Sequence, residues 1–384
     1  MRGFQISPAG VDIFVVFDET ISENFVATAL AQWGSLTPCR LTLEVDALLE
    51  NHAEGTLVVS QRSHQEVVTD YPAATHTLMV DDEERAFERL TVEVTLRMLE
   101  HLAGSLNLLH AAALSDSASG HAMVLVGPSG RGKTTASRFL GKKFNYLSDE
   151  TAIIQSDFHL RPYPKPLSLI TAEHQSKQQI DPASLGIATV APSDYSFELK
   201  HLILLNRQQE ATSPRLDRVA LADALIEIVE QTSGVRRAER GIEGLIEVVN
   251  YCGGALRLTY SEISDTLGLL QDLMGGKVVF PSEEVSLYME KADDGEEARS
   301  QDENTGLLRR YPQSSVFQID ERTLISTKDW LIEVSPFAAE IWFELLTPAT
   351  TESLKNRLEQ QVGPIPDDAF KATLESLSDH EIIL

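Results

Sequence analysis

The pattern of apolar and polar residues divides the chain into three parts. In the first part, short apolar runs alternate with polar turns, and residues 11–17 and 57–60 form the clearest strands. A charged segment follows at residues 82–102, where apolar side chains that include Leu90 and Leu96 are spaced as on one helical face. We therefore predict an N-terminal α+β domain over residues 1–104.

The middle part alternates short apolar runs with segments of helical periodicity. Its expected strands are residues 106–114, 123–126, 144–147, 152–154 and 202–205. Strands that alternate with helices are typical of an α/β fold. We assign residues 105–281 to this second domain.

A break in the hydrophobic pattern sets off the last part. Residues 282–304 contain nine acidic residues against two basic ones. This composition is typical of linkers, so we predict a linker at residues 282–307. Two strand-like runs and three amphipathic helices follow, and Ser335 and Pro336 give the N-cap and first-turn pattern of a helix start. We expect residues 308–384 to form a separate small domain.

Charge and composition narrow the classes of partner. The formal net charge of -26 argues against general binding to nucleic acid or to anionic membranes, and it would suit a basic peptide. No apolar run approaches the roughly 18 residues that cross a bilayer, and the N-terminus does not follow a secretory signal pattern. Cys39 and Cys252 match neither a metal-binding spacing nor a disulfide framework. We expect a cytoplasmic protein, and the sequence leaves open whether it forms a homo-oligomer.

The strongest chemical signal is the segment Gly127-Pro128-Ser129-Gly130-Arg131-Gly132-Lys133-Thr134. It matches the phosphate-binding loop pattern G-x-x-x-x-G-K-[ST], and it stands between a predicted strand and a predicted helix, as that motif requires. Glycine lets backbone N–H groups turn toward phosphate oxygens, and the helix N-terminus adds a favourable dipole. The alternative is a glycine-rich turn that binds nothing.

The motif assigns a role to its last residues. Lys133 would reach the β- and γ-phosphates of ATP, and the Thr134 hydroxyl would ligate Mg²⁺. We therefore predict ATP and Mg²⁺ as cofactors. The predicted nucleotide-binding residues are the loop itself and Thr135, which follows it.

Two adjacent acids follow the strand after the phosphate loop. Asp149 could hold Mg²⁺ or take a proton from an attacking hydroxyl. Glu150 can join Asp149 at one metal only if the strand has already ended, because neighbouring side chains of a strand point to opposite faces. We predict Asp149 as a catalytic residue, together with Lys133. The predicted metal ligands are Thr134, Asp149 and Glu150, and for Glu150 a local salt bridge in a turn is the alternative.

His110 is a further residue of interest. It lies in the apolar run of residues 106–114, and a lone histidine on an apolar strand is more often a satisfied core residue. Its spacing alone does not assign it a catalytic role.

Three segments together resemble the HPr kinase/phosphorylase-like family. They are residues 108–114 with His110, residues 126–135 and residues 147–150, and they keep the family's order of strand histidine, phosphate loop and acidic strand end. The resemblance implies a P-loop core near that of phosphoenolpyruvate carboxykinase, and phosphoryl transfer to a serine hydroxyl. It also implies that His110 is a catalytic residue and that Asp149 is the base, or the acid that holds the nucleophile.

Two features of that family are missing here. Its classical members have a second aspartate where this chain has Glu150, and they carry a signature of Arg-Gly-Met-Gly character that this chain lacks. These differences leave open both the phosphorylase half-reaction and a bacterial sugar-transport carrier as the substrate.

Two basic features could contact phosphates. Lys165 lies in the run of residues 164–169, which is similar to the proline-rich loop of such kinases; the alternative is an ordinary surface lysine. Arg236, Arg237 and Arg240 form the densest basic cluster of the chain. They could clamp transferring phosphates or an acidic substrate, or they could belong to a solvated helix face.

The C-terminal domain resembles the PqqD-like domains that bind leader peptides in ribosomal peptide modification. The resemblance rests on a predicted hairpin at residues 315–326, the run at residues 332–342 and three helices. It implies that the leader peptide binds as an added strand against the hairpin and beside a helix. The alternative is an ordinary winged-helix packing module, and the low basic content argues against DNA binding.

The sequence thus predicts an α/β protein with a P-loop nucleotide-binding core of the HPr kinase/PEP carboxykinase-like type. An N-terminal α+β segment and a C-terminal winged-helix-like domain flank this core. The predicted activity is an ATP-dependent kinase that transfers the γ-phosphoryl group to a hydroxyl, expected to be serine, of a peptide or protein. One alternative is a nucleotide-binding protein that presents a leader peptide without catalysis. Another is a kinase for a small molecule such as free serine or a sugar.

Overall fold

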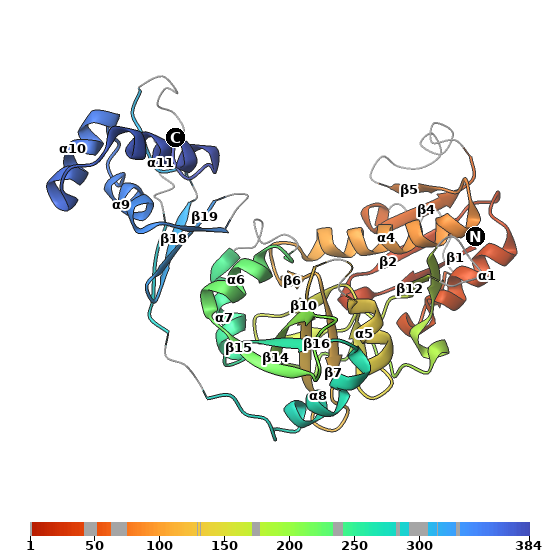
Figure 1. Cartoon of the computed structure of the whole chain (residues 1–384). Coiled ribbons are helices and arrows are strands. Elements are labelled where there is room, and N and C mark those ends of the chain that lie inside the picture. The colour runs from red at the N-terminus through yellow and green to blue at the C-terminus, as the bar shows by residue number, and fades with distance from the viewer. Residues whose placement is uncertain are drawn as a thin grey trace. The chain divides into compact units, whose positions relative to one another are not determined.

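The chain is a mixed α/β protein with several sheets (Figure 1). The structure is a computed structural model that describes residues 2–41, 52–62, 75–128, 130, 132–170, 177–232, 241–281, 285–291, 306–312, 314–327 and 331–384. Several predictions fall outside these residues, namely those for Ser129, Arg131, Arg236, Arg237, Arg240 and most of the predicted linker. Within the described part, no helix combines the length and the apolar character that a membrane span needs.

The chain divides into two compact units. The first comprises residues 1–219 and 230–281, and the second comprises residues 220–229 and 282–384. Each unit has its own hydrophobic core.

The first unit begins with a five-stranded sheet in the order β3-β1-β2-β4-β5. Its strands are β1 (Arg2–Ile6), β2 (Ile13–Phe17), β3 (Cys39–Arg40), β4 (Thr56–Ser60) and β5 (His76–Met79). Strands β2, β4 and β5 run parallel. The helices of this part are α1 (Glu23–Gln32) and α4 (Glu83–Leu102), and α4 lies alongside β2 and β5 (Figure 1).

Helix α4 confirms the predicted helix, but its packing face differs from the expected one at one position. Leu90, Val94 and Met98 are fully buried, and they lie one turn apart on the same face. Leu96, which we expected on this face, is 42% exposed. It follows Val94 by two positions, and that spacing turns a helical side chain to another side of the helix.

The core beneath the five-stranded sheet extends beyond the first hundred residues. Leu108, Ile153 and Tyr163 belong to the same buried cluster as residues of β1, β2 and α4. Tyr163 also shares a hydrogen bond with Thr95 of α4, with 2.8 Å between the two hydroxyl oxygens. The N-terminal segment therefore packs directly against the segment that follows it.

The centre of the first unit is a nine-stranded sheet. Its longest path runs β6-β10-β11-β14-β8-β7-β9, and β16 pairs with both β14 and β15. The strands are β6 (Asn107–Leu109), β7 (Ala111–Ser115), β8 (His121–Val126), β9 (Asn145–Ser148), β10 (Ala152–Ile154), β11 (His159–Arg161), β14 (Phe197–Arg207), β15 (Arg215–Val219) and β16 (Ala255–Tyr260). The pairs β8–β14 and β14–β16 are parallel, whereas β7 is antiparallel to both of its neighbours.

Helices cover this sheet, and a small hairpin follows β11. The helices are α5 (Lys133–Leu140), α7 (Gly241–Tyr251) and α8 (Leu267–Met274), and the hairpin consists of β12 (Leu167–Ile170) and β13 (Lys177–Ile180). Ala136 and Leu140 of α5 share one buried cluster with Leu125 of β8 and Leu270 of α8. Helix α8 therefore shares a core with β8 and α5, the strand and helix on either side of the glycine motif.

The second unit contains a four-stranded antiparallel sheet in the order β17-β18-β19-β20 and four helices among its described residues. The strands are β17 (Leu287–Lys291), β18 (Ser315–Ile319), β19 (Arg322–Ser326) and β20 (Leu331–Val334), and the helices are α6 (Leu221–Val229), α9 (Pro336–Glu344), α10 (Thr351–Val362) and α11 (Asp367–Asp379). The Ser335 hydroxyl caps α9 by accepting from the N–H of Ala338, which confirms the predicted helix start.

Strand β17 lies within the segment that we predicted to be a linker. Its apolar side chains, Leu287 and Met289, alternate along an otherwise acidic segment, and its backbone pairs with β18. Residues 287–291 are therefore part of the C-terminal sheet. Strand β17 has only five residues. Its short apolar pattern could not be recognised among the surrounding acidic residues.

Candidate functional site

Three strand ends meet at one edge of the nine-stranded sheet. Strand β7 runs antiparallel to both β8 and β9, so the start of β7 lies at the same edge as the ends of β8 and β9. His110 precedes β7, Gly127 follows β8, and Asp149 follows β9. The pairing gathers the histidine, the glycine loop and the acid, which the sequence analysis singled out from three separate segments.

The side chain of Lys133 folds back over the backbone of the glycine loop. Gly130 and Gly132 have φ angles of 79° and 91°, in a left-handed region that side chains rarely adopt. A helix follows the glycines as predicted, but α5 begins at Lys133, within the motif, and not after Thr134. The Lys133 side chain turns back, and its Nζ donates to the carbonyls of Gly127 and Pro128 at 2.5 and 3.3 Å.

Lys133 is a charged residue near the end of the loop, at the first position of α5. It is buried, and burial lowers its pKa below the ordinary value, although the charges of Glu150 and Asp149 act in the opposite direction. Its partners in the loop are carbonyl dipoles rather than a formal negative charge. An anion that entered the loop would give Lys133 a stronger partner than these carbonyls. Thr135, in contrast, is exposed on the first turn of α5.

Asp149 is buried and accepts hydrogen bonds on both of its oxygens. The Thr134 hydroxyl donates to Oδ2 and the Tyr146 hydroxyl donates to Oδ1, each at 2.9 Å. Burial raises the pKa of Tyr146, and the Asp149 charge raises it further, so this phenol stays protonated as a donor. Two neutral donors therefore hold the carboxylate beside the end of the glycine loop.

Lys165 provides the positive partner of the two acids. Its Nζ lies 3.3 Å from Asp149 Oδ1 and 3.0 Å from Glu150 Oε2, and the side chains of Lys165 and Asp149 are each only 3% exposed. Burial lowers the pKa of Lys165, but the charges of Asp149 and then Glu150 outweigh this effect and raise it. Lys165 is a buried residue of the site, so the interpretation as an ordinary surface lysine is wrong.

Glu150 lies on the same side as Asp149 because the strand has ended. Strand β9 stops at Ser148, and the Ser148 hydroxyl accepts from the N–H groups of Glu150 and Thr151 at 3.3 and 3.0 Å. This bend lets both acids face Lys165. The Glu150 side chain is 40% exposed, so it is the more accessible of the two carboxylates.

His110 sits at a break between two strands. We predicted a single strand at residues 106–114, but β6 pairs with β10 whereas β7 pairs with β8 and β9. The chain therefore turns at His110, where its N–H donates to the carbonyl of Gln231 at 2.6 Å. Burial lowers the pKa of His110, and the nearby Lys133 charge lowers it further.

The donor set at this edge fits Mg²⁺ that arrives with a phosphate ligand. Thr134, Asp149 and Glu150 offer a hydroxyl and two carboxylates, which are hard oxygen donors. Within the described ranges, no group of three or more His, Cys, Asp and Glu residues could hold a metal by itself. Mg²⁺ is commonly bound through one or two carboxylates together with substrate phosphates and water, so the set suits a nucleotide-bound cation.

The sequence does not mark Tyr146 as a site residue, and it leaves the role of Lys165 open. Tyr146 occupies an ordinary apolar position of β9, and no pattern marks it. The sequence around Lys165 does carry a sign of its burial. Lys165 is the only charged residue in the run Tyr163-Pro164-Lys165-Pro166-Leu167, and prolines flank it on both sides. An isolated charge among apolar neighbours indicates burial with a partner.

His110 should titrate below its ordinary pKa of 6.5, because burial and Lys133 both disfavour the protonated ring. Histidine ring signals followed by NMR against pH would measure this, with His110→Gln to assign the signal. Lys133→Met should move the His110 pKa back toward 6.5, because it removes the neighbouring positive charge. A His110 pKa at or above 6.5 in the wild type would contradict this geometry.

Comparison with known proteins finds a likeness to solved structures and to no protein family. No protein-family profile and no curated protein matches this chain. The solved structure of the Hpr(Ser) kinase/phosphatase from Coxiella burnetii is similar to part of it, with 15% sequence identity and a TM-score of 0.24, covering 44% of this chain and 94% of that one. A TM-score this low gives no basis for transferring a fold or an activity.

Proposed function

We propose that the chain is an ATP-dependent phosphotransferase that phosphorylates a hydroxyl, expected to be serine, of a peptide or protein. The observation that carries this proposal is the 2.9 Å hydrogen bond from Thr134 Oγ1 to Asp149 Oδ2. It joins the last residue of a P-loop sequence to an acid at the end of a nearby strand, where the motif needs a metal-binding carboxylate. A glycine-rich turn without a ligand would not require a buried lysine and a buried acid beside it.

Positioning and charge neutralisation would supply most of the catalysis. In this proposal Lys133 exchanges the carbonyls of Gly127 and Pro128 for the β- and γ-phosphate oxygens. Loop N–H groups, including that of Gly132 at the start of α5, would bind the same phosphates. Mg²⁺ held by Thr134 and the two acids would neutralise phosphate charge when it is bound.

The acceptor hydroxyl must lose its proton during transfer. We assign that proton to the carboxylate of Asp149, as the resemblance implies. The acceptor oxygen forms a bond to the γ-phosphorus, the bond from that phosphorus to the bridging oxygen breaks, and ADP leaves. His110, whose lowered pKa favours a neutral ring, would offer one N–H to a phosphoryl oxygen.

A groove in the second unit supports a peptide substrate. It has a volume of about 370 Å³ and lies between β20, the start of α9 and α11. Strand β20 is at the end of the sheet order, so one side of its backbone pairs with none of the described strands and could accept an added strand. We propose that this groove binds a leader segment of the substrate, as in PqqD-like domains.

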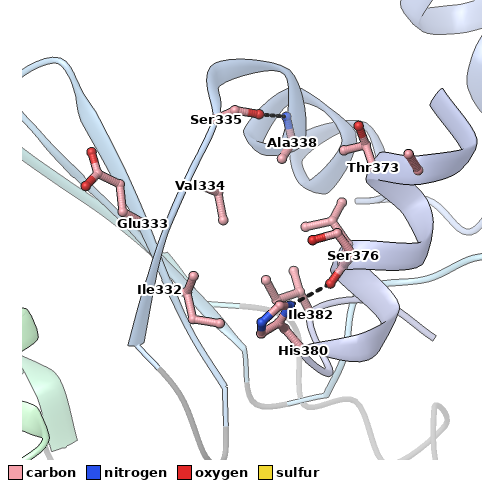
Figure 2. A pocket seen from close by; sticks show the side chains of 11 residues that line it. Ile332, Glu333, Val334, Ser335, Ala338, Thr373, Ser376, His380 and Ile382 are labelled. Carbon is pink, nitrogen blue, oxygen red and sulfur yellow. Dashed lines mark hydrogen bonds between the residues drawn. The ribbon is translucent and has the colours of Figure 1, made fainter. Parts of the chain in front are cut away.

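The side chains of the groove suit an extended peptide with apolar residues at alternate positions. Figure 2 shows Ile332 and Val334 pointing toward α11, with Glu333 between them on the other side of the strand. Opposite them lie Ser376 and His380, whose ring nitrogen bonds to the Ser376 carbonyl at 2.8 Å. Covalent linkage of such a binding domain to a kinase would raise the local concentration of the acceptor.

The wild-type chain should add one phosphoryl group to its peptide substrate in the presence of ATP and Mg²⁺. Lys133→Ala and Asp149→Asn should each slow the transfer by about 100-fold or more, because each removes a charge that acts in the transition state. Mass spectrometry of peptides encoded beside the gene would measure the modification and locate the acceptor.

Lys142→Ala is a suitable control for these variants, because Lys142 is an exposed lysine just after α5 and should leave the rate unchanged. If no peptide gains mass although ATP binds tightly, the kinase proposal fails, and a protein that presents a leader peptide becomes the better account. Transfer to free serine by a chain that lacks residues 308–384 would instead favour a small-molecule kinase.

A bulky side chain in the groove should block the leader peptide. Ser376→Trp should weaken binding of a fluorescein-labelled leader by about tenfold or more, because it fills a central position of the groove. Ser378→Trp is the matched control, since Ser378 is exposed on the same helix and does not line the groove. Fluorescence anisotropy would compare the two, and equal affinities would contradict the proposed binding site.

A further inference from the structure

Lys165 is a cation built into the candidate metal site. Its ammonium group contacts Asp149 Oδ1 and Glu150 Oε2 at 3.3 and 3.0 Å. It also donates to the carbonyl of Pro166 at 3.3 Å. Both oxygens of Asp149 and one oxygen of Glu150 therefore already have a partner when no metal is present.

The backbone holds Lys165 firmly in this position. Prolines 162, 164 and 166 fix the main chain around it, and each proline restricts the residue before it to extended conformations. The N–H of Tyr163 donates to the carbonyl of Leu147 in β9, and the N–H of Lys165 donates to the carbonyl of Tyr163, each at 2.8 Å. Tyr163 in turn bonds to Thr95 of α4. The lysine is thus fixed to the strand that delivers the acids.

Among the described residues of the site, the charges balance without a metal ion. Asp149 and Glu150 carry two negative charges, and Lys165 and Lys133 carry two positive ones. A free divalent cation would have to displace or repel Lys165 to reach the carboxylates, and it would leave a positive excess in a largely buried site. A cation that arrives with nucleotide phosphates brings its own negative charge, and Lys133 can then move to those phosphates.

We propose that Lys165 is the resident counter-cation of Asp149 and Glu150, so that the empty site rejects a free divalent cation and accepts one only together with nucleotide phosphates. This inference rests on the proposed phosphotransferase site and adds an order of binding to it. Lys165 is a positioning residue here, since it acts through the two acids.

Mn²⁺ binding to the full chain, followed by electron paramagnetic resonance of the free ion, tests this order. Without nucleotide, the wild type should bind Mn²⁺ only weakly at the site, and adding ADP should create a tight site. Lys165→Met should tighten Mn²⁺ binding without nucleotide by about tenfold or more, because it removes the positive charge that contacts both carboxylates. Lys177 is an exposed lysine that pairs with Glu88. The control variant Lys177→Met should bind Mn²⁺ as the wild type does.

Two further variants control for misfolding and for Mn²⁺ binding elsewhere on the protein. Lys165→Gln provides a polar replacement if Lys165→Met folds poorly, which circular dichroism would reveal. Adding Asp149→Asn to either variant should abolish the gain in Mn²⁺ affinity, which separates this site from ion binding elsewhere on an acidic surface. Persistence of the gain in the double variant would overturn the proposal.

Further results would also contradict the proposed role of Lys165 as a counter-cation. Equal Mn²⁺ affinity of the wild type and both Lys165 variants without nucleotide would overturn the counter-cation role. Loss of ADP binding in the Lys165 variants when no metal is present would also overturn it, because it would make Lys165 a phosphate ligand. None of these readouts requires phosphoryl transfer. A chain that shows the Mn²⁺ pattern but modifies no substrate would refute the proposed function and leave the role of Lys165 intact.

Discussion

The burial of charge at one edge of the nine-stranded sheet is the constraint on which the rest of the site depends. Asp149 and Lys165 are almost completely removed from water, and neither would be tolerated there alone. Their pairing fixes the end of β9, and Tyr146 and Thr134 complete the hydrogen bonds of the carboxylate. Thr134 is also a residue of the glycine loop, so the same acid orients the start of α5.

The N-terminal segment contributes to this arrangement through packing. Tyr163 lies two residues before Lys165, belongs to the core under the five-stranded sheet and bonds to Thr95 of α4. Its N–H also bonds to the carbonyl of Leu147 in β9. Helix α4 thus supports the proline-rich segment that places Lys165, which gives a structural role to a part of the chain without a recognisable motif.

Patterns of adjacent residues were enough to predict helices, loops and caps. The contacts that form the candidate site depend on pairing between segments that are distant in the sequence. The loop, the helix after it and the cap at Ser335 could be predicted, because each depends on a few adjacent residues. The contact of Lys165 with Asp149 could not, because it joins two segments through the sheet and a proline-rich turn. The break at His110 was also hidden, since one apolar run serves two strands with different partners. Leu96 shows that an apolar residue near a helical face need not belong to it.

We propose that Thr134 and Asp149 assemble a metal-dependent nucleotide site. Isothermal titration of ADP into the wild type and into Thr134→Val, with Mg²⁺ and then with EDTA, tests this most directly. The wild type should bind ADP, and loss of the hydroxyl should weaken binding by about tenfold with Mg²⁺ but hardly at all with EDTA, because the hydroxyl acts through the cation. Absence of ADP binding by the wild type, or equal affinity of the two proteins with Mg²⁺, would contradict it.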